Sequence, residues 1–259
     1  MLKRTVAAVL ALLLALAAVV AVNTLRQGSR QLQVPPAPPL AVDQAAVADK
    51  LAGAIRFRTV SSASDPDHNR DEFLKLHAHL QQRFPRVHAT LQREVVGGLS
   101  LLYTWPGTDA NARPVALLAH HDVVPIEPGT EPKGGAPPLG GGGGDGHVWG
   151  RGAWDDKGNL IAQLEAVEML LAAGFQPRQT VYLVSGADEE VSGLRGAQQI
   201  ARLLAERQVG LEFVLEIELT PERRLARANP VQVREALATR GFFLQMPPPP
   251  DAAPYDAGE

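Results

Sequence analysis

The 259 residues are enough for one or two domains, and a hydrophobic content of 45% with 20% charged residues is typical of a globular protein. The formal net charge of −3 provides no basic field, so the composition argues against binding to nucleic acid. Since the chain has no cysteine, disulfides and thiolate metal sites are excluded, and any metal ion would need His, Asp or Glu ligands.

The N-terminus carries an unbroken apolar run at residues 6–22, preceded by Lys3 and Arg4. A helix over this run would span roughly 26 Å at about 1.5 Å per residue, enough to cross a bilayer. We therefore predict an uncleaved signal anchor over residues 1–25, with a cleaved signal peptide as the alternative. The anchor would hold the rest of the chain outside the cytoplasm, and cleavage would make it secreted. The Pro-rich residues 26–43 predict a stiff linker.

Helical and extended patterns alternate beyond the linker. This alternation indicates an α/β fold, in which helices flank a mostly parallel sheet, and it predicts one domain over residues 44–216. The expected helices cover residues 44–56, 70–83, 157–173 and 193–207, and the expected strands cover residues 100–105, 115–119, 180–185 and 211–215.

Two segments depart from this pattern. Residues 134–146 contain Gly-Gly, Pro-Pro and a run of glycines at 140–144, which predicts a mobile loop. Residues 217–259 lose the alternation and end in the Pro-rich segment 247–259, which predicts a divergent, disordered tail.

Three polar motifs lie where predicted strands end or predicted helices begin. They are HHDVVP at residues 120–125, GRGAWDDKG at residues 150–158 and DEE at residues 188–190. Because ligand sites in α/β sheets form at the carboxyl ends of the strands, we expect the three motifs to converge on one site.

The first motif allows two interpretations. His120 would bind a metal ion through one ring nitrogen while Asp122 holds the other N–H, or His120 would be a loop histidine with a structural hydrogen bond. His121 is expected to be a neighbour of the site and not a ligand.

The second and third motifs are equally open when each is taken alone. Asp155 or Asp156 would bridge two metal ions, or would cap the helix that follows. Of Glu189 and Glu190, one would bind a cation and the other would accept a proton from metal-bound water, or the pair would be a solvated acidic turn.

Taken together and in this order, the motifs resemble those of the di-zinc exopeptidases and acylases that include carboxypeptidase S, aminoacylase and succinyl-diaminopimelate desuccinylase. The resemblance covers residues 45–216. The runs AIRFRTVS at residues 54–61 and SLLYTW at residues 100–105 are similar to the carboxypeptidase S branch, which an N-terminal membrane anchor also fits. The resemblance implies a zinc-exopeptidase fold with a mostly parallel sheet.

The family's site implies a role for each matching residue. His120, oriented by Asp122, would bind one zinc ion, Asp155 would bridge both ions, and Glu190 would bind the second ion. The last strand, FVLE at residues 213–216, would supply a further carboxylate to the first zinc ion, from its final residue Glu216. Cobalt or manganese would suit the same ligand types.

The implied reaction is hydrolysis of an amide bond. Glu189 would act as the general base and take a proton from the water that attacks the amide carbonyl. The substrate would be a small peptide or an N-acyl amino acid, as for a carboxypeptidase or an N-acyl amino acid hydrolase.

The resemblance stops at about Glu216, where the chain continues with IELT at residues 217–220. The family's inserted lid domain, its final catalytic segment and its histidine ligand for the second zinc ion would then be missing, since no histidine follows His147. We therefore expect an incomplete, truncated fold, with a frameshift as one explanation, and we do not expect the homodimer that the lid mediates in relatives.

Two other functions remain open on the sequence. The first is a non-catalytic remnant that binds one metal ion weakly or none. The second is a membrane-tethered binding module whose Pro-rich tail recruits a partner.

Overall fold

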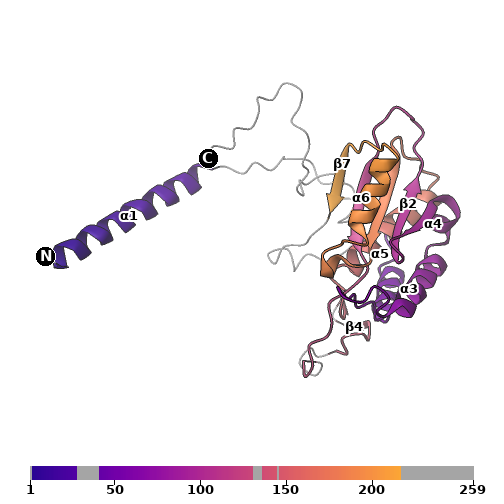
Figure 1. Cartoon of the computed structure of the whole chain (residues 1–259), viewed down its shortest axis with the longest axis horizontal. Helices are drawn as coiled ribbons and strands as arrows, with labels where there is room; N and C mark the ends of the chain where they lie inside the picture. Colours follow the sequence, from indigo (N-terminus) through magenta and orange to yellow (C-terminus); the bar gives the residue numbers. More distant parts are fainter. Residues whose placement is uncertain (1, 28–40, 131–135, 145, 217–259) are drawn as a thin grey trace. The chain divides into compact units, whose positions relative to one another are not determined.

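The computed structural model describes residues 2–27, 41–130, 136–144 and 146–216 (Figure 1). The chain separates into two compact units, Met1–Pro35 and Pro36–Glu259. Most of the predicted linker and all of the predicted tail lie outside the described residues, so both stay predictions.

The first unit contains the helix α1, Leu2–Arg26. Its stretch Lys3–Arg26 has a mean hydropathy of 2.9, and none of this stretch is buried within the described residues. By length and composition this helix can cross a membrane, and a signal sequence has the same properties. The exposed apolar helix is thus compatible with either a signal anchor or a signal peptide.

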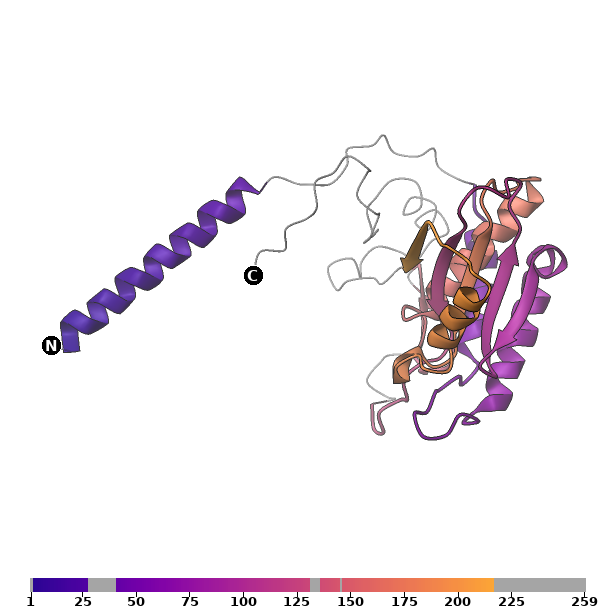
Figure 2. The same cartoon turned by 45° about the horizontal axis from the view of Figure 1, so that its top comes forward.

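The second unit is built on a five-stranded sheet with the order β1-β2-β6-β3-β7 (Figure 2). β3 pairs in parallel with both β6 and β7, whereas β2 is antiparallel to both of its neighbours. Only β2 therefore runs against the other strands, and the predicted mostly parallel α/β sheet is confirmed. The strands are β1 Gln92–Val96, β2 Ser100–Trp105, β3 Val115–His120, β6 Val181–Gly186 and β7 Phe213–Glu216.

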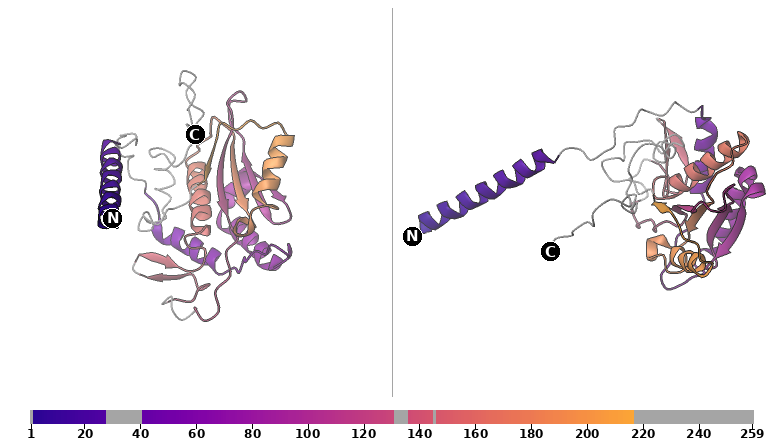
Figure 3. Two further views of the ribbon diagram at one scale, coloured as in Figure 1. Left: turned by 60° about the vertical axis from the view of Figure 1, so that its left-hand side comes forward. Right: turned by 90° about the horizontal axis from the view of Figure 1, so that it is seen from above.

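Helices cover both faces of this sheet (Figure 3). The face that α5 covers also carries α2 and α4, and Leu101 and Leu183 point into its core. The opposite face carries α6, and there Leu102 and Val184 pack against Ile200. Since neighbouring strand residues point to opposite faces, each buried strand supplies both cores. The helices are α2 Gln44–Ile55, α3 Arg70–Arg83, α4 Pro85–Thr90, α5 Lys157–Ala172 and α6 Ala197–Glu206.

The glycine-rich segment corrects one expectation. Gly142–Gly144 form strand β4, which pairs antiparallel with β5, His147–Trp149, so the predicted loop was wrong over these three residues. The hairpin is held against α2: a Cβ at Gly141 would lie 2.2 Å from the Ala52 carbonyl oxygen. Packing of the bare glycine backbone on a helix thus orders a sequence whose composition favours a loop.

The start of α6 corrects a second expectation. The helix begins at Ala197 and not at residue 193, because the chain first makes a short 3-10 turn, Glu189–Val191, and then a left-handed step at Ser192 and Gly193. Positive φ angles of 89° and 65° at these two residues are incompatible with an α-helix.

Candidate metal centre

The fold brings the three polar motifs to one end of the sheet: two of them follow the parallel strands β3 and β6, and the third precedes α5 and contacts His120 through Asp156. His120 is the last residue of β3 and lies opposite Gly186, the last residue of β6. The 3-10 turn with Glu189 and Glu190 follows β6 directly, and Glu216 is the last residue of β7. Backbone pairing alone therefore places imidazole and carboxylate groups from distant parts of the chain side by side.

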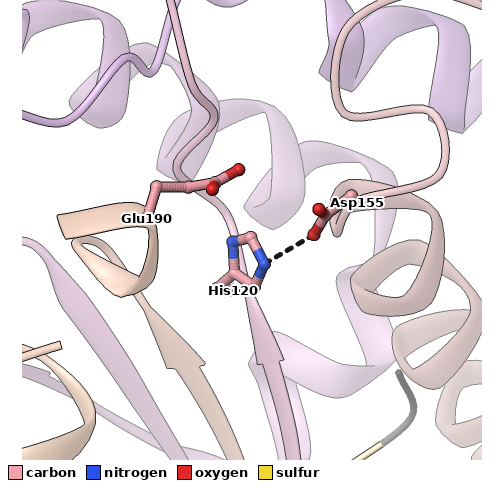
Figure 4. A group of neighbouring side chains, drawn as sticks. All are labelled: His120, Asp155 and Glu190. Atoms are coloured by element: carbon pink, nitrogen blue, oxygen red, sulfur yellow. Dashed lines mark hydrogen bonds and ion pairs between the residues drawn. The ribbon is translucent and has the colours of Figure 1, made fainter. Parts of the chain in front are cut away.

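Three of these side chains form a compact group of metal-binding atoms (Figure 4). One ligand atom from each of His120, Asp155 and Glu190 lies within 4.8 Å of the others. His120 Nε2 is 2.9 Å from Asp155 Oδ1, so the imidazole already faces this carboxylate. One imidazole and two carboxylates are ligand types that zinc accepts.

Two further predicted residues lie at the border of this group. Glu189 is about half-exposed, and its Oε2 is 3.7 Å from His120 Nε2. Glu216 is exposed and lines a pocket together with His120, Gly186 and Glu189. The fold thus brings Glu216 near the site but does not place it within the three-residue group.

Asp122 is fully buried behind His120, and donors surround it. Its Oδ1 is 3.3 Å from His120 Nδ1 and accepts the backbone N–H of Glu189 at 3.1 Å. Its Oδ2 accepts the backbone N–H of Glu190 at 3.1 Å and the hydroxyl of Ser61 at 2.7 Å. One carboxylate therefore contacts the imidazole and fixes the backbone of both glutamates.

The neighbouring aspartates have different partners. Asp155 is exposed and faces His120 Nε2, whereas Asp156 is buried and accepts the backbone N–H of His120 through Oδ2 at 3.0 Å. Asp156 precedes α5, but its side chain makes no capping hydrogen bond. Burial raises the pKa of Asp156 to about 8. The helix cap that was one interpretation of this motif is thus not formed by Asp156: Asp155 belongs to the metal-binding group, and Asp156 holds the end of β3.

The electrostatics of the group favour a positive charge. Burial lowers the pKa of His120, but hydrogen bonds to Asp122 and Asp155 outweigh it and raise the pKa to about 11. The pKa of Glu190 is raised by burial and then by the Asp155 charge. The carboxylates that stabilise a protonated imidazole here would also stabilise a divalent cation bound in place of the proton, so the donor set fits a metal ion.

Two residues of the matched runs, Ser61 and Lys157, had no role predicted from the sequence. Lys157 is fully buried, and its ammonium donates to the carbonyl oxygens of Ala54 at 3.1 Å and Phe57 at 2.7 Å. Burial lowers the pKa of Lys157 to about 7. Lys157 stands in the second motif and Ser61 at the end of the run 54–61, so their presence in these runs was the available signal.

His121 lies beside the group and outside it, where it was expected. The side chain is fully buried, its Nδ1 is 2.7 Å from Ser185 Oγ, and its Nε2 is 3.4 Å from His77 Nε2. Burial lowers the pKa of His121 to about 3, which keeps the ring neutral. It contributes to the packing beneath the site.

Comparison with known proteins agrees with this geometry. The profile of peptidase family M20/M25/M40 matches residues 116–235. The chain is 36% identical over 217 residues to carboxypeptidase S-like 2 of Dictyostelium discoideum, covering 79% of this chain and 41% of that protein. It is 42% identical over 172 residues to carboxypeptidase S of Saccharomyces cerevisiae, covering 61% of this chain and 29% of that protein. It is 41% identical over 170 residues to the N-fatty-acyl-amino acid synthase/hydrolase PM20D1 of Xenopus tropicalis, covering 65% of this chain and 32% of that protein.

Solved structures share the fold. Human carnosine dipeptidase 1 superposes with a TM-score of 0.55 at 19% identity, over 69% of this chain and 41% of that protein. The M20 family metallo-carboxypeptidase Sso-CP2 of Sulfolobus solfataricus gives a TM-score of 0.52 at 17% identity, over 70% of this chain and 39% of that protein.

The chain thus spans less than half the length of the relatives that it matches. Within that span, the family profile, the sequence identities and the shared fold all indicate the same family. The chain belongs to peptidase family M20.

Proposed function

We propose that this protein is a metal-dependent hydrolase of amide bonds. The observation that carries the proposal is the convergence of His120, Asp155 and Glu190 within 4.8 Å, with the carboxylate of Glu189 beside the imidazole. The family is metal-dependent, and this group is where the described part of the chain gathers metal-binding side chains.

His120, Asp155 and Glu190 would hold the metal, and Glu216 at the end of β7 would complete the ligands of the first ion. We propose zinc, with two ions as in the intact family, and cobalt or manganese as substitutes. When bound, zinc supplies a Lewis acid that polarises a carbonyl and lowers the pKa of a coordinated water.

The chain's own groups would then orient the reactants and move the proton. The Glu189 carboxylate would accept a proton from the attacking water and return it to the leaving amine. Asp122 would fix the imidazole of His120 and, through two backbone N–H groups, the positions of Glu189 and Glu190. Asp156 would hold the end of β3 through the backbone N–H of His120.

The names of the relatives suggest the substrate class. Carboxypeptidase S acts on peptides by its name, and PM20D1 on N-fatty-acyl amino acids. We propose a small peptide or an N-acyl amino acid as substrate, with the helix α1 as a signal anchor that keeps the site outside the cytoplasm, or as a signal peptide that leads to secretion.

A second function rests on a different observation. Within the described residues, the metal-binding group contains one imidazole, His120, beside two carboxylates. So few ligands would bind a metal ion more weakly than a full two-metal site, since ligand number and geometry set the affinity. The alternative is therefore a metal-binding protein without catalytic activity.

The variant Glu189→Gln separates these functions, tested in the full chain purified in detergent. For a hydrolase, zinc-loaded wild type releases amino acid from dipeptides or N-acyl amino acids, and the variant binds zinc normally but loses at least about a hundredfold in turnover. Glu206→Gln, on the exposed end of α6, is the matched control and should remain active. Zinc binding without release of amino acid from any substrate would favour the non-catalytic function.

A further inference from the structure

Arg195 lies outside the metal-binding group, on the segment between the Glu189–Val191 turn and α6. Its guanidinium reaches across to the loop that follows α2. Nη2 donates to the carbonyl oxygen of Ser62 at 2.6 Å, and Nη1 donates to that of Ala63 at 3.4 Å. Nε is 3.6 Å from Asp188 Oδ2. One planar cation thus connects two segments that are far apart in the sequence.

Asp188 depends on Arg195 for its side-chain contacts. The carboxylate is 4% exposed, and its Oδ2 accepts the backbone N–H of Arg195 at 2.8 Å in addition to facing the guanidinium. Its Oδ1 has no hydrogen-bond partner among the described residues. A buried carboxylate needs a compensating charge, and here the guanidinium of Arg195 supplies it.

The loop that Arg195 holds also reaches Asp122. Ser61, next to Ser62, donates its hydroxyl to Asp122 Oδ2, and the Asp122 carboxylate accepts the backbone N–H groups of Glu189 and Glu190. The contacts therefore close a ring that runs from Asp122 through the loop and Arg195 to Asp188, and from there along the chain to the two glutamates.

We propose that Arg195 is a positioning residue that fixes the turn carrying Glu189 and Glu190. Asp122 holds this turn by its backbone from one side, and Arg195 holds it from the other side through Asp188. A guanidinium suits the task because its rigid fork reaches two carbonyls and a carboxylate together, whereas a lysine ammonium is a point charge. Its effect on metal binding rests on the proposed function, but the ordering of the turn does not.

The ordering is tested first, without metal, by hydrogen exchange and mass spectrometry of the full chain in detergent. In Arg195→Met, the amides of Glu189 and Glu190 should exchange about tenfold faster or more, as expected when a charge-assisted hydrogen bond is lost. Arg195→Lys should give a smaller increase. The control is Arg207→Met, which removes a two-pronged ion pair with Glu94 on the surface and should leave these amides unchanged.

Metal binding is tested second, by zinc competition and by the visible spectrum of bound cobalt(II). We expect zinc affinity about tenfold lower in Arg195→Met, an altered cobalt spectrum, and partial recovery in Arg195→Lys. Unchanged exchange of the two amides in Arg195→Met would overturn the proposal, as would an equal increase in Arg207→Met. If wild type binds no metal but the exchange result holds, the proposed function fails and the positioning role stands.

Discussion

At the scale of single residues, Asp122 links the parts of the site. Its two oxygens face an imidazole, a hydroxyl and two backbone N–H groups, all of which act as donors toward it. A buried anion with this many donors is stabilised as a carboxylate: although burial opposes it, hydrogen bonds from His120 and Ser61 hold the pKa of Asp122 below its ordinary value.

The variant Asp122→Asn tests this role. An amide nitrogen would face a donor where an oxygen now accepts, so we expect zinc affinity to fall about tenfold or more and the free energy of unfolding to fall by about 1–3 kcal/mol. Competition with a zinc chelator and urea unfolding measure the two effects. Asp109→Asn, on the surface beside Arg178, is the control; equal losses in both variants would show that Asp122 has no special role.

At the scale of elements, the β4–β5 hairpin depends on one glycine. Gly141 has a φ of 58°, and a Cβ there would collide with the backbone of Ala52 in α2, whereas a Cβ at Gly142 would meet open space. We expect Gly141→Ala to lower the free energy of unfolding by about 2 kcal/mol and Gly142→Ala to change it by less than about 1 kcal/mol. Equal effects in urea unfolding would mean that the hairpin does not pack on α2.

The contact between α3 and the end of β3 predicts sensitivity to acid. Burial lowers the pKa of His77 to about 4 and that of its neighbour His121 to about 3. Since the unfolded chain binds these protons near pH 6.5 and the folded chain does not, stability is complete above pH 6.5 and falls as the pH drops toward 4.

The variant His77→Leu tests whether the buried histidines cause this loss of stability in acid. It should remove about 2 kcal/mol of the stability difference between pH 7 and pH 4.5, because one of the two buried rings no longer titrates. Thermal unfolding at several pH values measures this difference. A variant as sensitive to acid as wild type would assign the effect to other groups.

Many of the strands and helices could be predicted from the sequence. The apolar runs predicted at 100–105 and 180–185 correspond to β2 and β6 almost residue for residue, because both strands are buried by helices. The strand β1 was not predicted, since Gln92–Val96 is an edge strand whose residues are largely exposed and carry no apolar pattern. The order of strands was also beyond reach, because β2 inserts between β1 and β6 through pairings that only the folded chain creates.

The site was predictable to a similar degree. The sequence placed His120 and Glu190 at strand ends, and parallel pairing brings them together. The motif taken alone did not separate Asp155 from Asp156, because adjacent residues of one type carry no signal that tells which one faces the imidazole. The family resemblance chose Asp155, and Asp155 is the residue that faces it. The contacts of Arg195 and Lys157 were equally hidden, since, apart from the Arg195–Asp188 pair, their partners are backbone carbonyls, which any residue type carries.

At the scale of the whole molecule, the helix α1 predicts whether the protein stays with the membrane or in solution. Its exposed apolar surface has no cover within the described residues, so we expect the full chain to remain in the membrane pellet after an alkaline carbonate wash, at the mass of the uncleaved protein. A soluble product shortened by the N-terminal segment would show instead that α1 is a signal peptide.

The central claim is that His120, Asp155 and Glu190 form a metal site, and metal content per folded chain tests it most directly. Elemental analysis of the full chain in detergent, after loading with zinc and removal of excess, should give at least one tightly held zinc ion, lost in His120→Ala and Asp155→Asn. It should be kept in His68→Ala, whose imidazole is exposed and outside the group. No bound zinc in wild type, or equal zinc in all of these variants, would contradict the account.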